Sequence, residues 1–246
     1  MSNSNPVVKI SPKGVLFTLF GISAALVGLS VFGQYIRYFP DAFNMHSKLQ
    51  EFLFDLLMQS FYTDNEANVP TYFNTIILFI PSLLLAAIAV WKYAVKDKFK
   101  FQWFGLSLVF LYLSLDEASV LHEKLIPPMR ELFNYERYGG IFYFAWVIPG
   151  VIAILLFMLA YLRFFLHLEN KYKFLFFISL AMYVMGIIGG EMLSGHFAGT
   201  IGLKNFTYAT YTSLEESLEW TGCSLTIFSL LSYLQQYLPE GFTVKV

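Results

Sequence analysis

Ser114–Lys124 reads SLDEASVLHEK, and this stretch places ionisable side chains at the end of an otherwise apolar segment. On an α-helix, which turns about 100° per residue, Asp116 and Glu123 fall on one stripe. Glu117 lies to one side of that stripe and His122 to the other. A carboxylate near the middle of a membrane-spanning helix costs roughly 2.5 to 3.5 kcal/mol on insertion scales. We therefore expect the stripe to face protein, water or a cation rather than lipid.

The composition predicts a membrane protein. Of the 246 residues, 57% are hydrophobic and 13% are charged, and the mean hydropathy of +0.58 is too high for a soluble domain. The fold class expected is an all-α polytopic bundle. A formal net charge of -1 and the absence of a basic run give no basis for nucleic-acid binding. The single cysteine, Cys223, excludes an intrachain disulfide and a cysteine zinc cluster.

The apolar runs predict one transmembrane domain over residues 1–246, with six membrane-spanning helices. The spans are expected at about 15–38, 71–95, 101–125, 140–165, 172–195 and 212–238. The Ser114–Lys124 stretch therefore ends the third span. A further segment, 46–68, is amphipathic at first and acidic afterwards, and we expect it on the membrane surface.

The basic residues predict the orientation. With both termini in the cytoplasm, most of the 16 Lys and Arg residues lie on the inner side of the membrane. In a bacterium this arrangement places the chain in the inner membrane. The third span then ends, the fifth ends and the sixth begins at the same outer face, so we expect their polar motifs at one depth.

The fifth span ends in Gly186–His196, GIIGGEMLSGH. A small-xxx-small stripe predicts that another helix packs closely here, and its members are Gly186, Gly190 and Ser194. Glu191 beside this stripe is expected to point into the helix contact. Gly195 is expected to end the helix, which leaves the direction of His196 open.

The sixth span carries three glutamates on one polar stripe. Thr212 and Glu215 match a capping box, as do Ser213 and Glu216. One of those two glutamates is therefore expected to be structural. Glu219 lies a turn deeper, where no capping role applies.

Carboxylates and imidazoles from three helices are expected to meet in one pocket. The predicted metal ligands are Asp116, His122, Glu123, Glu191, His196, Glu215 and Glu219. Such a set suits iron, manganese or zinc, and a cation would offset the repulsion among the carboxylates. Glu117 and Glu216 are expected to act as catalytic carboxylates that move protons. The Glu-x-x-His pairs of di-iron proteins are absent.

Three motifs resemble those of uncharacterised bacterial multipass membrane proteins: DNEANVPTYF at 64–73, SLDEASVLHE at 114–123 and EESLEWTG at 215–222. The resemblance implies six spans and no activity. The chain lacks the seven spans and late HxxxH of ceramidase-type and adiponectin-receptor-type hydrolases, and its four histidines cannot fill the boxes of fatty-acid desaturases. The first motif suggests that Asp64 and Glu66 fold over the pocket as a lid.

Three functions remain open from the sequence. The first is a metal-dependent membrane hydrolase or oxidoreductase acting on a lipid, isoprenoid or quinone-like molecule. The second is a proton- or cation-coupled carrier that uses the same acids for coupling. The third is a nonenzymatic assembly or partner-binding subunit with a buried acidic network, whose protein partner the sequence does not identify.

Overall fold

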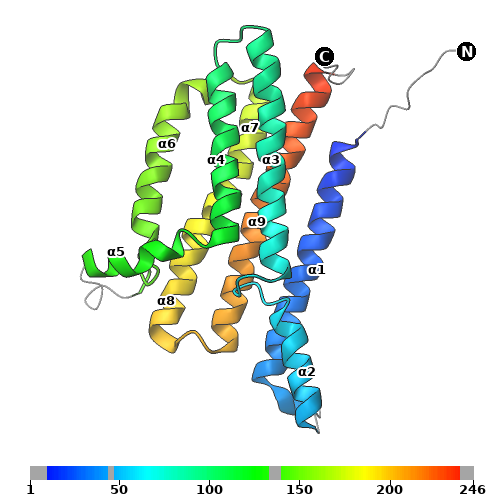
Figure 1. The fold of residues 1–246 in the computed structure, drawn as a ribbon, viewed down its shortest axis with the longest axis vertical. Coiled ribbons are helices and arrows are strands. Elements are labelled where there is room, and N and C mark those ends of the chain that lie inside the picture. Colours follow the sequence, from blue (N-terminus) through cyan, green and yellow to red (C-terminus); the bar gives the residue numbers. More distant parts are fainter. Residues whose placement is uncertain (1–9, 44–46, 133–139, 239–246) are drawn as a thin grey trace, which may run out of the picture.

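A computed structural model describes residues 10–43, 47–132 and 140–238. Within these ranges the chain forms helices and no strands, which confirms the all-α class (Figure 1). The described ends of the first and last helices, Pro12 and Tyr237, lie at the same end of the bundle.

The first half of the chain contains two long helices, α1 (Pro12–Tyr38) and α3 (Val69–Ala94). Between them lie a short 3-10 turn, η1 (Pro40–Phe43), and α2 (Lys48–Gln59). Polar side chains start these helices by accepting a hydrogen bond from the first turn, and the residues that do so are Ser11, Ser47 and Asn68. The expected surface segment at 46–68 therefore divides into α2 and a loop at 60–68.

The expected third span is not one continuous helix. α4 (Lys100–Ser119) ends where Val120 takes a left-handed backbone conformation with φ of 53°. A 3-10 turn, η2 (Glu123–Leu125), and α5 (Ile126–Leu132) follow, and the chain bends by 73° between α4 and 123–132. The prediction that the helix runs to residue 125 was wrong.

The side chain of Asp116 explains where the helix ends. Its carboxylate accepts a hydrogen bond from the backbone N–H of His122 at 2.9 Å, while its backbone carbonyl accepts from Leu121 at 3.3 Å. These bonds close the end of the helix. Asp116 and Glu123 consequently do not share a helical stripe.

The second half begins with α6 (Val147–His167), later than the expected start at 140. Pro149 lies in its first turn, where a missing N–H breaks no helical hydrogen bond. α7 (Asn170–Val184) continues through a π-helical turn, η4 (Met185–Gly190), into α8 (Glu191–Ile201). Gly195 lies inside α8, so the prediction that it ends the helix was wrong.

α9 (Phe206–Tyr237) is the longest helix and lies at the centre of the bundle. It packs against α1, α3, α7, α8 and η4. Its buried side chains include Trp220 and Ile227, which pack with Ile77 of α3. α6 is peripheral and keeps most of its apolar surface exposed (Figure 1).

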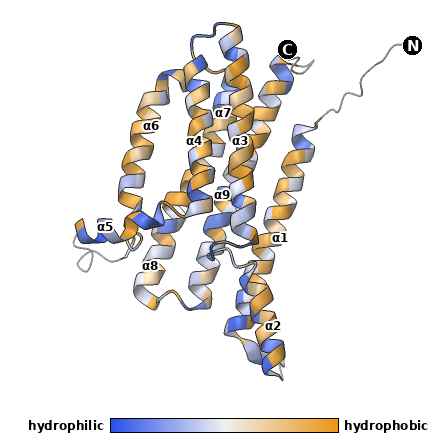
Figure 2. Cartoon of the chain, viewed as in Figure 1, coloured by the Kyte–Doolittle hydropathy of each residue, from blue (hydrophilic) through white to orange (hydrophobic). Residues whose placement is uncertain are grey.

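Four stretches are long and apolar enough to cross a membrane: α1, α3, α6 and Asn170–Ile201. The bent pair formed by α4 and Glu123–Leu132 adds a fifth if it is one span. α9 is not among these candidates, because three glutamates and many hydroxyl side chains interrupt its apolar sequence. Figure 2 shows the apolar residues along the shafts of α1, α3, α4 and α6.

Candidate functional site

An acidic cavity of about 260 Å³ lies where the lower half of α9 meets α4, α8 and the 60–68 loop. Nine carboxyl-bearing residues line it: Asp64, Glu66, Asp116, Glu117, Glu123, Glu191, Glu215, Glu216 and Glu219. Within the described part of the chain, no Lys or Arg lines the cavity. Of the described lining residues, His122 alone can carry a positive charge, which is too little to balance nine carboxylates.

The structure brings the predicted site residues together in this cavity, with one exception. Asp116, Glu117, His122, Glu123, Glu191, Glu215, Glu216 and Glu219 all line it. His196 is not among the lining residues. It is exposed on α8, and its Nδ1 atom is 3.8 Å from the position that a Cβ atom on Gly140 would occupy.

Asp116 and His122 form a paired unit on one side of the cavity. Oδ2 of Asp116 lies 2.9 Å from Nδ1 of His122, in addition to the backbone hydrogen bond. The His122 ring also lies 4.9 Å from the ring of Trp146. These contacts fix the orientation of the imidazole, and Nε2 is the nitrogen left to hold a ligand or a proton.

Glu191 and Glu215 face each other from α8 and α9. Glu191 accepts a hydrogen bond from Nε1 of Trp146 at 3.0 Å, and Glu215 accepts one from the hydroxyl of Ser194 at 2.9 Å. Each carboxylate is thus oriented by a neutral donor. Because neither donor carries charge, the repulsion between the two carboxylates is not cancelled.

The predicted small-residue stripe is the contact between the π-helical turn and α9. A Cβ atom added to Gly186 would lie 2.5 Å from Cγ of Glu219, and one added to Gly190 would lie 2.7 Å from Cγ of Glu215. Both distances are far shorter than van der Waals contact. The absence of side chains at these glycines therefore lets the stems of both glutamates enter the helix contact.

The capping interpretation of the sixth helix was wrong. α9 begins at Phe206, and the side chain of Asn205 caps it by accepting from the N–H of Tyr208 at 2.8 Å. Glu215 and Glu216 consequently lie well inside the helix. Neither has a capping role at its N-terminus.

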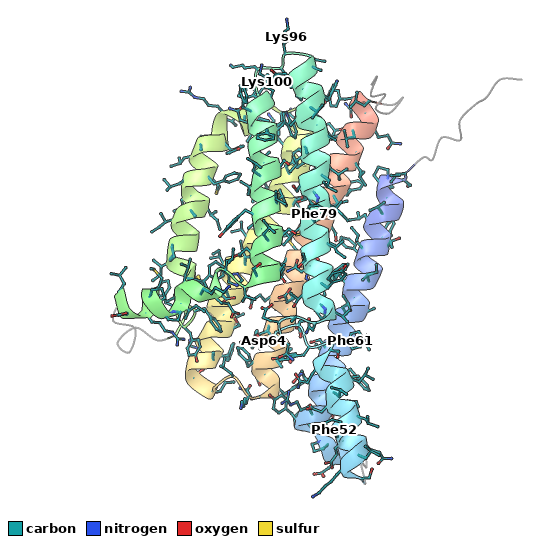
Figure 3. All side chains as sticks on the ribbon, viewed as in Figure 1. Phe52, Phe61, Asp64, Phe79, Lys96 and Lys100 are labelled. Atoms are coloured by element: carbon teal, nitrogen blue, oxygen red, sulfur yellow. The ribbon has the colours of Figure 1, made fainter. Side chains whose placement is uncertain are left out.

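Thr63, Asp64 and Glu66 of the 60–68 loop line the cavity, and the lid role of the loop stays a prediction. Asp64 accepts hydrogen bonds from the hydroxyl of Tyr62 at 3.1 Å and from that of Tyr208 at 3.0 Å. Figure 3 shows Asp64 toward one end of the bundle and Lys96 and Lys100 at the other. The acidic loop and this basic turn are therefore on opposite ends of the helices.

Three buried hydroxyl groups attach this loop to the bundle. Ser30 of α1, Thr63 of the loop and Ser213 of α9 form a triangle with oxygen–oxygen distances of 3.2, 3.1 and 3.0 Å. The backbone N–H of Thr63 also donates to Ser30 at 3.1 Å. This network fixes the position of Asp64, the next residue in the chain.

The loop carboxyl groups hold their protons more strongly than carboxyl groups in water. Although the Asp64 residue keeps part of its surface in contact with water, desolvation of its carboxyl group beside the cavity raises the pKa of Asp64 to about 7, while the hydrogen bonds from its two tyrosine partners lower it. Burial also raises the pKa of Glu66, and the charge of Glu123 adds to the effect. Both shifts show that negative charge is disfavoured at this side of the cavity.

Sequence reasoning missed Asn74, a fully buried residue of α3. Its side-chain amide is within interaction range of the carboxyl groups of Glu117 and Glu219. A sequence signal existed, because an amide inside the apolar run NTIILFI of a membrane-spanning helix needs a polar partner.

Among the residues that the structure describes, no group of three or more His, Cys, Asp or Glu side chains is arranged to hold a metal ion. The carboxyl groups share one cavity without converging on one point. Metal binding by the predicted ligands therefore stays a prediction.

One protein family, described as a domain of unknown function (DUF8692), has a model that matches residues 19–234. The chain belongs to this family. In this DUF8692 protein the matched range includes every residue that lines the acidic cavity. No curated protein and no solved structure matches the chain.

Proposed function

We propose that this protein is a metal-dependent enzyme of the bacterial inner membrane that acts on a lipid-like molecule from the outer side. The observation that carries the proposal is the cavity itself, where nine carboxyl groups meet without a Lys or Arg among the described lining residues. Such a cavity needs protons or cations to be stable in a low dielectric. Hard carboxylate oxygens together with an imidazole suit iron, manganese or zinc.

The residues that line the cavity are proposed to have three roles: metal binding, proton transfer and contact with the apolar part of the substrate. The proposed ligands are Asp116, His122, Glu123, Glu191, Glu215 and Glu219. Glu216 and Glu117 are the proposed proton-transfer groups beside the metal, which would activate water or dioxygen. Apolar side chains in the same lining suit the hydrocarbon part of a substrate, and they are Leu113, Phe144, Trp146, Ile187 and Leu203.

The proposal includes six membrane crossings, with α9 as the sixth and both termini in the cytoplasm. α9 is too polar to face lipid, yet α1, α3, α7 and α8 surround it. A helix shielded in this way tolerates ionisable groups that point into a cavity. The burial of Glu215 and Glu219, each 8% exposed, supports this interpretation.

Elemental analysis of detergent-purified protein tests the proposal. We expect near-stoichiometric iron, manganese or zinc in the wild type and loss of that metal in Asp116→Asn and Glu219→Gln. Even an outer-shell partner of a metal contributes roughly 10- to 100-fold in affinity, so removal of a ligand should lower occupancy clearly. Glu51→Gln, an exposed change on α2, is the control that should keep the metal.

Wild-type protein that contains no metal, even after incubation with each of the three ions, would contradict the proposal. If Asp116→Asn and Glu219→Gln both retained the metal, the metal would not be bound by the proposed cavity ligands. Once the metal is known, activity is measured on lipid and quinone-like substrates with the metal removed and restored.

A coupled carrier is the second candidate, because unpaired polar atoms continue inward from the cavity along α9. Nε1 of Trp220 and Oγ of Ser224 are buried and have no hydrogen-bond partner within the described chain. These atoms suit the start of a polar path toward the other side. Cation uptake into proteoliposomes that depends on a proton gradient, and that fails in Glu219→Gln, would favour the carrier.

A further inference from the structure

A second groove, of about 590 Å³, lies at the end of the bundle where the described chain begins and ends. It is formed by the start of α1, the start of α7 and the last turns of α9. Lys13 and Lys171 supply its charge, and within the described part of the chain no Asp or Glu lines it. The groove is therefore positively charged, in contrast to the acidic cavity, and it takes no part in the proposed chemistry.

The groove exists because α1 begins lower along the bundle than α9 ends. The two helices are antiparallel and touch at Ser30 and Ser213, where the hydroxyl oxygens lie 3.1 Å apart. From this contact α9 runs about two turns further toward the groove than α1 does, roughly 9 Å at the usual helical rise. Figure 1 shows the same step between the start of α1 and the end of α9. This part of α9 therefore stays uncovered, and Gln235 and Gln236 are exposed there.

The side chains of the groove are hydrogen-bond donors that suit a phosphate group. Neither lysine forms an ion pair with a described residue, and Lys171 donates to Oε1 of Gln236 at 3.3 Å. The hydroxyl of Ser232 and the amide of Gln235 also line the groove, and the positive end of the α1 dipole adds to the potential of the lysines. Glu169 accepts from Nε2 of Gln236 at 3.5 Å but is not a lining residue.

Apolar surface continues from the groove along the outside of the bundle. Phe228 lines the groove from α9. Phe17 lies one turn after Lys13 on the same face of α1, and 69% of its surface is exposed. A ligand with a charged head and a hydrocarbon tail fits both parts of this surface, whereas an inorganic anion would use only the lysines.

We propose that this groove binds the phosphate headgroup of an anionic phospholipid, with Lys13 and Lys171 on the phosphate and the acyl chains on the neighbouring apolar surface. Lys96 and Lys100 lie at the same end of the bundle (Figure 3), and the proposed orientation places this lysine-rich face in the cytoplasmic leaflet. Anionic lipids give that leaflet a negative surface potential. The proposal uses this orientation, but it uses none of the chemistry of the acidic cavity.

Native mass spectrometry of the full-length protein in neutral detergent measures this binding, with phosphatidylglycerol as the probe. We expect the first phosphatidylglycerol to bind more tightly than phosphatidylcholine, because only phosphatidylglycerol carries a net negative charge. Lys13→Gln and Lys171→Gln should each weaken phosphatidylglycerol binding roughly fivefold, and the double variant about 25-fold, from the usual contribution of a lysine near a membrane surface. Lys13→Arg combined with Lys171→Arg keeps the charge and should retain binding.

The matched control is Lys96→Gln combined with Lys98→Gln, which removes the same charge from exposed residues at this end that do not line the groove. Equal losses of phosphatidylglycerol binding in the control and the groove double variant would overturn the site, and so would unchanged binding in the groove variant. Displacement of phosphatidylglycerol by an equimolar amount of inorganic phosphate would assign the groove to a free anion and overturn the lipid. None of these outcomes depends on metal content, so failure of this proposal and failure of the proposed function are distinguishable.

Discussion

At the scale of single residues, Asp64 connects the titration of the cavity to the stability of the fold. Burial raises its pKa to about 7 from the value near 4 of an unfolded chain. The folded state therefore holds a proton that the unfolded state has already lost between these two pH values. By linkage, this contribution to stability is complete below about pH 4 and is lost as the pH rises through about 7.

We expect Asp64→Asn to reduce the pH dependence of unfolding. In the wild type, the free energy of unfolding should fall between about pH 5 and pH 8, and Glu66 should add to that fall in the same direction. The amide of the variant does not titrate. The free energy of unfolding of Asp64→Asn, relative to that of the wild type, should therefore rise with pH. Because Asp64 keeps contact with water in the cavity, screening reduces the size of the effect.

Thermal unfolding in detergent from pH 5 to pH 8 measures this difference. Asp41→Asn, which removes a carboxyl group from an exposed residue of η1 outside the cavity lining, is the matched control variant. A wild-type profile that rises with pH, or an Asp64→Asn profile of identical slope, would show that the loop carboxyl group does not titrate as the structure indicates.

The residues of the site were only partly predictable from the sequence. Carboxylates inside apolar segments are conspicuous, which is why Glu191 and Glu219 were found. Their hydrogen-bond partners were not predicted: Trp146 comes from a distant segment and carried no signal of its own, and Ser194 was singled out only as a small residue of the helix contact. His196 was grouped with the site by its residue type, but α8 continues past Gly195 and leaves it exposed outside the cavity lining.

At the scale of helices, the contact between the π-helical turn and α9 depends on glycine. We expect Gly186→Ala to destabilise the protein by about 1 to 3 kcal/mol, the usual cost of overpacking, because the added Cβ would lie 2.5 Å from Cγ of Glu219. The same displacement should weaken metal binding by that glutamate. Thermal unfolding and metal content of the variant measure the two effects.

Gly189→Ala is the matched control for this contact. It lies in the same turn, but an added Cβ would meet no atom within 4 Å. Alanine at this position should be neutral or stabilising, since it restricts the unfolded chain more than glycine does. Equal destabilisation by both alanines would mean that glycine serves the conformation of the turn and not the helix contact.

Helix ends were the least predictable elements. Valine rarely adopts a left-handed backbone conformation, so the residue type of Val120 did not predict the end of α4. That helix end depends on hydrogen bonds that Asp116 forms only after the chain has turned. The start of α9 could have been predicted from the sequence. Gly202 favours a turn, and Asn205 is a residue type preferred at helix N-caps. The acidic segment at 212–219 matches the capping pattern of a helix start, and the helix was therefore predicted to begin at 212 instead of 206.

At the scale of the whole molecule, the number of crossings is testable by cysteine labelling. In a Cys223→Ser background, we expect an impermeant maleimide added outside intact cells to label Glu66→Cys. Lys98→Cys and Gln235→Cys should react only after the membrane is opened, because α3 and α9 would each cross once between the two faces. Labelling of Gln235→Cys from the same side as Glu66→Cys would show that α9 does not cross.

The central position of α9 has a consequence for how the protein is made. The ribosome synthesises the chain from its N-terminus, so in the proposed membrane arrangement α1, α3 and α7 would enter the bilayer before α9, the helix that they contact. Until α9 emerges, Asn74 and Glu117 lack the carboxyl groups that complete their surroundings. In the proposed membrane arrangement, a chain truncated before α9 would lack the helix that α1, α3 and α7 all contact and would leave polar groups facing lipid, and cellular proteases remove incompletely folded chains of this kind.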